Sequence, residues 1–171
     1  MKAGRSLKRA GAVIVGKTNL HELAFGVTGI NDWTGTPINP QAPDRVPGGS
    51  SSGAAASVAF GLAPAAIGSD SGGSVRIPAA WNDLVGLKTT EGSLPLTGIV
   101  PLFESMDTVG PLAHSVEDCN LLLSAMNGNA PADLVGASLS GKRIAILESL
   151  ALDGLRDRPG KGFDDAALRM S

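Results

Sequence analysis

The sequence between residues 47 and 78, PGGSSSGAAASVAFGLAPAAIGSDSGGSVRIP, contains the pattern that decides the fold. Two turns rich in glycine and serine, Pro47–Gly53 and Gly68–Pro78, flank a helix-like segment, Ser51–Phe60, and a strand-like segment, Ala65–Gly68. Glycines directly before a serine let the backbone approach a ligand closely and leave consecutive N–H groups free. Such groups can form an anion site or an oxyanion hole, so we expect this unit to carry the chemistry.

Short strand-like and helix-like patterns alternate on both sides of this unit, which indicates an α/β fold. A long loop rich in glycine and proline, Gly26–Gly49, precedes the first turn, and loops of this length are usually functional. The capping box Ser115–Asp118 predicts a helix that Gly128 ends. We also expect helices at Ala3–Ala10 and Phe163–Met170, a short helix through Ala24, and strands at Ala12–Val15, Leu84–Leu87 and Lys142–Glu148.

Composition excludes several classes of protein. The chain has 171 residues, 43% of them hydrophobic, which is enough for a core and is the size of one domain. Its net charge of −2 argues against nucleic acid or an anionic membrane as the main partner. A single cysteine, Cys119, excludes an internal disulfide, and no Cys/His spacing suits zinc. We therefore expect a cytoplasmic protein with no metal and no cofactor.

One formal motif is rejected. Gly11–Thr18, GAVIVGKT, has the spacing of a phosphate-binding P-loop. Its intervening residues are strand formers, and the segment before it is helix-like, so the backbone cradle for phosphates is missing. A serine nucleophile would need a base, and neither His21 nor His114 has a companion motif. A Ser-His-Asp triad and a lysine base both stay open at this point.

The chain contains five ordered motifs: GKTNLHEL at Gly16–Leu23, GGSSSG at Gly48–Gly53, GSDSGGSVRIP at Gly68–Pro78, VGLKT at Val85–Thr89 and MDTVGPLA at Met106–Ala113. Together they resemble the amidase signature family of serine hydrolases. The likeness covers Ala3 to about Gly128 and continues more loosely through Gly141–Leu147. It implies an α/β fold with a mixed sheet covered by helices on both faces. It also implies one partial domain over 1–171, with core motifs at 12–128 and the start of a following segment at 129–171.

The resemblance implies a Ser–Ser–Lys mechanism. Ser74 matches the nucleophile that forms the acyl-enzyme, and Ser50 matches the bridging serine, whose peptide bond is typically cis. Their separation of 24 residues agrees with the family's register and favours Ser50 over the two serines that follow it. The backbone N–H groups of Ser71, Gly72, Gly73 and Ser74 would form the oxyanion hole.

Other site residues are interpreted as supports. Asp70 and Arg76 flank the nucleophile in the family's usual pattern, and we expect charge-assisted hydrogen bonds between them to hold the turn. Ser71 stands where the family most often has threonine. The family's lysine precedes the bridging serine by more than the 49 residues present before Ser50. We therefore expect the chain to be a central fragment with little or no amidase activity alone, because a serine without its base is a weak nucleophile.

The sequence thus predicts hydrolysis of a carboxylic amide to an acid and ammonia, with a small-molecule amide as substrate. One alternative is the glutaminase (A) subunit of a tRNA-dependent amidotransferase, which would need partner subunits. Another is a truncated, non-catalytic module that binds carboxylates. We expect neither nucleic acid nor a membrane as partner, and a homodimer or a partner subunit stays open.

Overall fold

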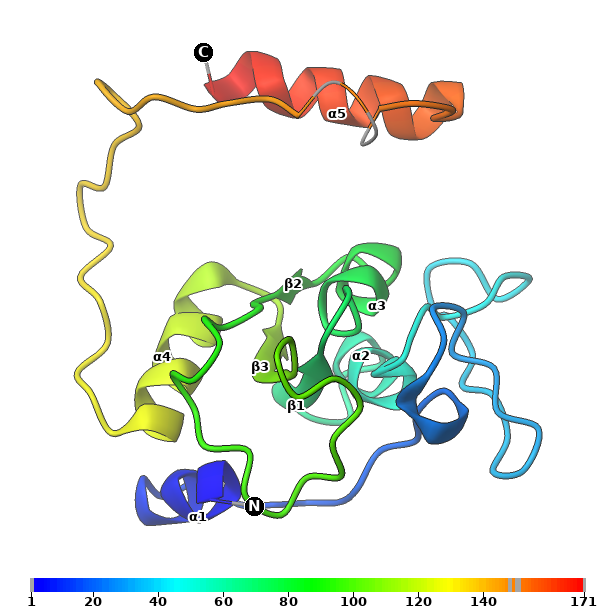
Figure 1. Ribbon diagram of the computed structural model, residues 1–171, viewed down its shortest axis with the longest axis vertical. Coiled ribbons are helices and arrows are strands. Elements are labelled where there is room, and N and C mark those ends of the chain that lie inside the picture. Colours follow the sequence, from blue (N-terminus) through cyan, green and yellow to red (C-terminus); the bar gives the residue numbers. More distant parts are fainter. Residues whose placement is uncertain (1, 148, 150–151, 171) are drawn as a thin grey trace. The chain divides into compact units, whose positions relative to one another are not determined.

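The computed structural model of the chain describes residues 2–147, 149 and 152–170. These fall into two compact units, Met1–Asp133 and Leu134–Ser171, which are described separately (Figure 1). The first unit contains the serine–glycine turns and every described strand. The candidate site therefore belongs to the first unit.

A small antiparallel sheet forms the centre of the first unit. Its strands are β1 (Ala65–Asp70), β2 (Val85–Gly86) and β3 (Thr108–Ala113), in the order β1-β3-β2. The register of β1 and β3 places Ala65 opposite Ala113 and Asp70 opposite Thr108. Strand β3 is buried along its whole length, as expected for the central strand.

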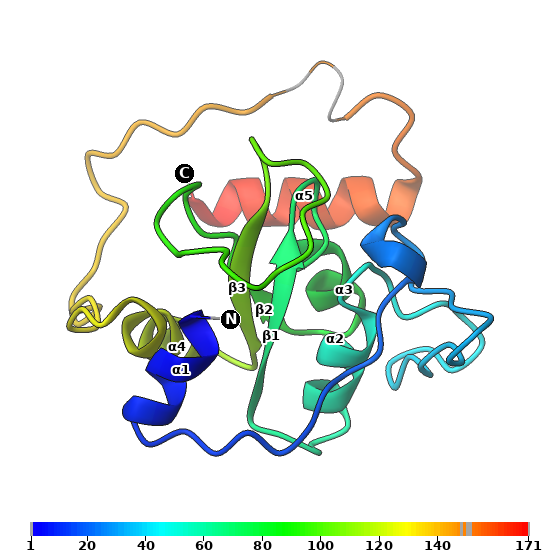
Figure 2. The ribbon, with the colours of Figure 1, turned by 60° about the horizontal axis from the view of Figure 1, so that its bottom comes forward.

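Helices cover both faces of this sheet (Figure 2). α2 (Ser52–Ala59) and α3 (Arg76–Trp81) pack on one face, and α1 (Lys2–Arg9) and α4 (Val116–Asn127) lie on the other. Because side chains alternate along a strand, neighbouring residues of β1 and β3 enter two separate cores. One core contains Leu7, Ile67, Val109 and Met126, and the other contains Ala54, Ala66, Val75 and Leu112.

Most of the elements near the two turns agree with the sequence patterns. The helices expected at Ala3–Ala10 and Ser51–Phe60 are α1 and α2 within a residue or two. Strand β1 extends two residues beyond the predicted Ala65–Gly68, and β2 is shorter than the predicted Leu84–Leu87. Local patterns therefore located these elements, while pairing with β3 decided where the strands end.

Helix α4 begins and ends at the residues that the sequence predicts. Ser115 is its N-cap, and the Ser115 Oγ accepts the Asp118 N–H at 3.0 Å. Gly128 is the C-cap, with a left-handed φ of 80°. Both cap signals are local, which explains why sequence alone sufficed.

Replacing Ser115 by alanine should lower the free energy of unfolding by about 1 kcal/mol, because the Asp118 N–H loses its acceptor. Urea denaturation followed by circular dichroism measures this loss. Ser115→Thr, which keeps a capping hydroxyl, is the matched control and should stay close to the parent protein. Equal stability of all three proteins would contradict the capping role.

Three predicted elements are wrong. Ala12–Val15 forms no strand, and its side chains Val13 and Val15 are 83% and 76% exposed, because no described strand pairs with it. Residues 142–147 are likewise irregular and exposed, and Glu148 lies outside the described residues. The helix expected through Ala24 is only a 3-10 turn, Glu22–Ala24.

Two elements were missed by the sequence patterns. Strand β3 contains Gly110 and Pro111, residue types that normally argue against a central strand. Helix α3 is short and lies partly inside the segment assigned to the second turn. Both elements depend on packing in the first unit rather than on local preference.

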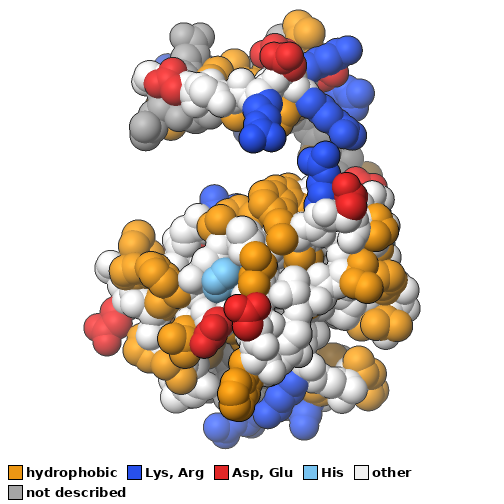
Figure 3. All heavy atoms as spheres, turned by 90° about the vertical axis from the view of Figure 1, so that its right-hand side faces the viewer, with side chains coloured by type: hydrophobic (Ala, Val, Ile, Leu, Met, Phe, Trp, Pro, Cys, Tyr) orange, Lys and Arg blue, Asp and Glu red, His pale blue; other side chains and the backbone are white. Residues whose placement is uncertain are grey.

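The second unit contains helix α5 (Asp157–Met170), which starts six residues before the predicted Phe163. None of its described side chains is buried. None of the described helices is both long and apolar enough to cross a membrane. In the view of Figure 3, exposed apolar side chains form several separate groups on the first unit.

Candidate active site

The two serine–glycine turns lie against each other. The first turn leads into α2, and α2 packs against β1, which leads into the second turn. The backbone N–H of Ser51 donates to the carbonyl oxygen of Ser74 at 3.1 Å. The Ser51 Oγ donates to the carbonyl oxygen of Ser69 at 3.3 Å. The fold thus brings the segments of Ser50 and Ser74 together, although 24 residues separate them.

Ser50 occupies a buried position at the end of the first turn. The residue is 1% exposed, and the peptide bond between Gly49 and Ser50 is cis, as the resemblance implied. The carbonyl oxygen of Ser50 accepts the backbone N–H groups of His21 at 2.9 Å and Ser52 at 2.8 Å. These bonds fix the backbone that carries the Ser50 hydroxyl.

The Asp70 carboxylate organises the second turn. It is fully buried and accepts the N–H of Gly73 at 2.7 Å and the N–H of Val75 at 3.1 Å. The Arg76 guanidinium donates to both carboxylate oxygens at 3.0 Å, while half of its side chain stays exposed. Burial raises the pKa of Asp70, but the hydrogen bonds from Arg76 and the two N–H groups outweigh it and hold that pKa below its usual value.

This arrangement corrects one of the implied oxyanion donors. The N–H of Gly73 donates to Asp70, so it is not available to a substrate. Within residues 2–147, the N–H groups of Ser71, Gly72 and Ser74 have no hydrogen-bond partner. Gly73 has a φ of +126°, and a Cβ there would lie 2.7 Å from Ile77 Cδ1, so the turn requires glycine.

Sequence reasoning missed Asp107, which lies directly before β3. The Asp107 carboxylate accepts a hydrogen bond from the Ser71 hydroxyl and is 7% exposed. It also accepts the backbone N–H groups of Leu102 at 2.7 Å and Phe103 at 3.0 Å. Its position inside the quoted motif MDTVGPLA was the only signal, and that motif does not indicate a role.

A cavity of about 240 Å³ lies beside Ser50. Ser51 and Ser69 also line it, and the described side chains that line it include no lysine, histidine or carboxylate. The cavity can therefore hold a small group but offers it no charged partner of its own. The remaining lining residues are Thr18, Asn19, Leu20, Ala24, Ala54, Ile67, Gly68, Ile99 and Val109.

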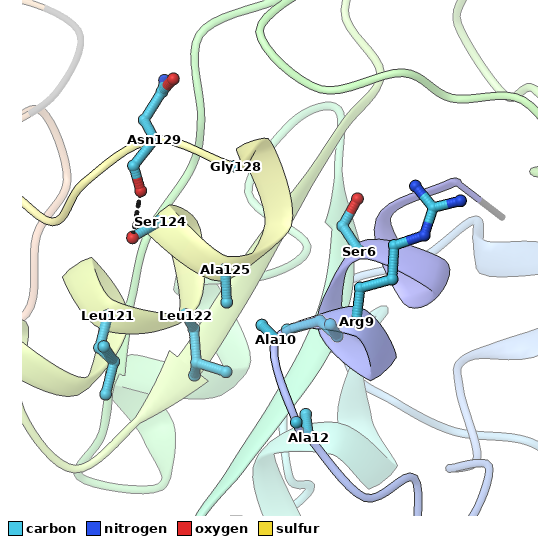
Figure 4. A pocket seen from close by; sticks show the side chains of 12 residues that line it. Ser6, Arg9, Ala10, Ala12, Leu121, Leu122, Ser124, Ala125, Gly128 and Asn129 are labelled. Carbon is cyan, nitrogen blue, oxygen red and sulfur yellow. Dashed lines mark hydrogen bonds between the residues drawn. The ribbon is translucent and has the colours of Figure 1, made fainter.

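A second cavity, of about 750 Å³, lies between α1 and α4 (Figure 4). Leu122 and Ala125 from α4 face Ala10 and Ala12 across it, whereas the Arg9 side chain extends away from these residues. None of the candidate site residues lines it. Its lining combines apolar side chains with the polar side chains of Ser6, Arg9, Ser124 and Asn129.

The remaining candidate bases lie elsewhere. Lys17 is exposed, and the Lys88 ammonium donates to the Thr89 carbonyl oxygen at 3.4 Å. The His114 ring nitrogen Nε2 lies 3.2 Å from the Val58 carbonyl oxygen. The backbone N–H of His21 donates to the Ser50 carbonyl oxygen at 2.9 Å, and the His21 ring nitrogen Nδ1 lies 3.4 Å from Thr28 Oγ1. Within the described residues, no cluster of His, Cys, Asp and Glu could hold a metal ion.

Comparison with known proteins shows the family of the chain. The sequence matches the Amidase family over residues 3–152. The chain belongs to the Amidase family. This match extends over α1, the whole sheet and both serine–glycine turns.

Two relatives of this chain in the Amidase family have different names. The A subunit of the glutamyl-tRNA(Gln) amidotransferase from Carboxydothermus hydrogenoformans is 43% identical, and the match covers 94% of this chain and 36% of that protein. A fatty acid amide hydrolase from Arabidopsis thaliana is 50% identical over 127 residues, which is 74% of this chain and 21% of that protein. The chain therefore spans about a fifth to a third of the length of these relatives.

A solved structure of an Amidase family member confirms the fold. The crystal structure of the glutamyl-tRNA(Gln) amidotransferase A subunit from Thermotoga maritima superposes with a TM-score of 0.71 and is 42% identical. It covers 73% of this chain, and this chain covers 28% of it. The predicted α/β amidase fold is thus confirmed for the matched part of the chain. The described strands pair antiparallel, however, and do not form the mixed sheet that the resemblance implied.

Proposed function

We propose that the two serine turns perform amide hydrolysis through an acyl-enzyme, with Ser74 as nucleophile and Ser50 as the bridging serine. The observation that carries this proposal is the hydrogen bond from the Ser51 N–H to the Ser74 carbonyl oxygen, which holds the two turns together. The free N–H groups of Ser71, Gly72 and Ser74 support it, because an oxyanion needs such donors. The substrate would be a small carboxylic amide, and no cofactor is required.

The chemistry proceeds in two steps. The Ser74 Oγ attacks the amide carbonyl carbon, while its proton passes through the Ser50 hydroxyl to a base. The C–N bond then breaks, the nitrogen leaves as ammonia with the returned proton, and the acyl group stays on Ser74. Water attacks this ester in the second step, which releases the acid and restores the serine. Each oxyanion donor typically contributes about 2.7–4 kcal/mol in the transition state.

The described residues at the cavity beside Ser50 do not include a base. Among the described residues, no lysine or histidine lines that cavity, so none is placed there to accept the proton that the Ser50 hydroxyl would relay. We therefore expect the chain by itself to react slowly with amides. The resemblance implies a lysine in this role, and the cavity of about 240 Å³ has room for a small amine.

Small primary amines should therefore restore reactivity to the chain. We expect methylamine or ethylamine, supplied above pH 9, to speed the labelling of Ser74 by a fluorophosphonate by about tenfold. This gain is a fraction of the 10²–10⁴-fold that a positioned general base contributes. Intact-protein mass spectrometry, followed by peptide mapping, measures the rate and the site of labelling.

Matched controls separate the roles of the two serines. Ser74→Ala should abolish labelling, and Ser50→Ala should remove the dependence on amine while leaving the site intact. A tertiary amine of the same basicity but larger volume should give no gain. Labelling at another serine, or no labelling of Ser74 under any condition, would refute the proposed nucleophile.

A glutaminase (A) subunit of a tRNA-dependent amidotransferase is the second candidate. The relatives named as the A subunit of a glutamyl-tRNA(Gln) amidotransferase favour it, and in that case partner subunits would complete the assembly. Hydrolysis of glutamine, in preference to simple amides, by the amine-supplemented protein would distinguish it. The cytoplasm is the proposed location, since a single cysteine suits a reducing compartment.

A non-catalytic, carboxylate-binding module is the third candidate. It would use the same three free N–H groups without any acyl transfer. Saturable binding of a carboxylate to a protein whose Ser74 never becomes labelled would favour this module over both enzymes.

A further inference from the structure

Asp107 lies 36 residues after Ser71 in the sequence but contacts it in the second turn of the candidate site. Its carboxylate belongs to a residue that is only 7% exposed and accepts three hydrogen bonds, from the Ser71 hydroxyl and from the N–H groups of Leu102 and Phe103. A carboxylate held in this way carries its charge without a cationic partner, because the three donors replace its water. Burying a carboxylate costs free energy. We therefore expect the three hydrogen bonds of Asp107 to have a structural role.

The sheet brings Asp107 to the second turn. Asp70 is paired with Thr108 at the end of the β1–β3 ladder, so the next residues along, Ser71 and Asp107, face each other just beyond it. At the same end of the ladder, the Thr108 Oγ1 donates to the Asp70 carbonyl oxygen at 2.7 Å and adds a second link between β1 and β3. The first residue of the turn is therefore tied to β3 by side chains where backbone pairing stops.

We propose that Asp107 is a positioning residue for the second turn: by accepting the Ser71 hydroxyl, it fixes the orientation of the peptide N–H groups at Ser71 and Gly72. Asp70 holds the far half of the turn through the N–H groups of Gly73 and Val75. Asp107 holds the near half, where Asp70 makes no hydrogen bond. Asp70 and Asp107 together hold the turn in one orientation, while the N–H groups of Ser71 and Gly72 stay without a hydrogen-bond partner among the described residues.

The same carboxylate connects the turn to a neighbouring loop. The N–H groups of Leu102 and Phe103 donate to Asp107, and the Phe103 ring lies against the Phe25 ring with a centroid distance of 6.4 Å. Asp107 therefore holds the loop of residues 101–106 and the second turn in one arrangement. The positioning role of Asp107 does not depend on the proposed function. Only the identity of the group that the free N–H groups bind rests on it.

A spectroscopic test reads the contact directly, without any reaction. Burial raises the pKa of Asp107, but the hydrogen bonds from Ser71 and from the two N–H groups bring it below its usual value. In the full chain, the carboxyl ¹³C signal of Asp107 should titrate at a lower pH than that of a free aspartate. Ser71→Ala should raise this pKa, whereas Ser71→Thr, which keeps a hydroxyl, should restore it.

Charged neighbours are controlled in the same experiment. The elements that meet at Asp107 also carry Glu104 in the loop and the Asp70–Arg76 pair at the end of β1. Glu104→Gln removes an exposed carboxylate from the same loop and should leave the Asp107 signal unchanged. An Asp107 signal that ignores Ser71→Ala, or that moves equally in the threonine variant, would overturn the proposal.

A second readout links the contact to the turn. Ser71→Ala and Asp107→Asn should each loosen the turn and speed hydrogen exchange at the Gly73 amide, whose N–H donates to Asp70, by about tenfold, the scale of a lost hydrogen bond to a charged group. The double variant should exchange no faster than Asp107→Asn alone, because Ser71→Ala removes a bond that Asp107→Asn already removes. Additive effects would overturn the proposal. Failure of Ser74 labelling alone would refute the proposed function and leave these two measurements to decide the role of Asp107.

Discussion

Replacing Asp70 by alanine should lower the free energy of unfolding by about 3 kcal/mol. The buried carboxylate accepts hydrogen bonds from the N–H groups of Gly73 and Val75 and from Nε and Nη2 of Arg76. Its loss leaves these donors without an acceptor, which typically costs about 3–5 kcal/mol for a buried pair. The lower end applies because half of the Arg76 side chain is exposed and water can solvate it.

Urea denaturation at several pH values measures this loss. The folded-state pKa of Asp70 is lowered, so its contribution is complete above the usual pKa of 3.8 and disappears as the pH falls through the folded value. The difference between the two proteins should therefore be constant at neutral pH and shrink in acid. Glu91→Ala, which removes an exposed carboxylate, is the control and should change little. A loss below about 1 kcal/mol at neutral pH would contradict the role of Asp70, since that is the size of an exposed ion pair.

Gly110→Ala should destabilise the first unit by about 3 kcal/mol or more, the upper end of what overpacking costs. Gly110 lies in the middle of β3, opposite Gly68 of β1. A Cβ at this position would lie 1.9 Å from the carbonyl oxygen of Leu87, and a backbone atom cannot turn aside as a side chain can. The Leu87 N–H also donates to the Pro111 carbonyl oxygen at 3.0 Å, so a shift of this segment would break that bond.

Thermal or urea unfolding of the variant measures this effect. Gly16→Ala is the matched control, because a Cβ there meets nothing within 4 Å and its φ is not in the left-handed region. The control should unfold like the parent protein. Parent-like stability of the Gly110 variant would mean that β2 and β3 are not paired as described.

Sequence alone predicted the parts of the fold that depend on neighbouring residues. The caps at Ser115 and Gly128 and the turns around Ser50 and Ser74 each rest on a few adjacent residues, and the structure has them where the pattern places them. The strand expected at Ala12–Val15 fails for the opposite reason. A strand needs a partner along its length, and the sequence pattern reports only the apolar side chains.

In the candidate site too, contacts within a local motif were predicted and contacts between distant segments were not. The hydrogen bonds between Asp70 and Arg76, six residues apart, follow from a local motif and were expected. The contact between Ser71 and Asp107 joins residues 36 positions apart. It depends on the antiparallel register of β1 and β3, and β3 was not predicted as a strand. The use of the Gly73 N–H by Asp70 also needed coordinates, because a motif does not show where an N–H group points.

The exposed segment after α1 has a consequence for handling the protein. Val13, Ile14 and Val15 are 83%, 51% and 76% exposed, and the run contains neither a charge nor a proline. Consecutive β-branched side chains of this kind favour strand pairing between molecules, which is the first step toward aggregation. We therefore expect this chain to aggregate in concentrated solution without unfolding first.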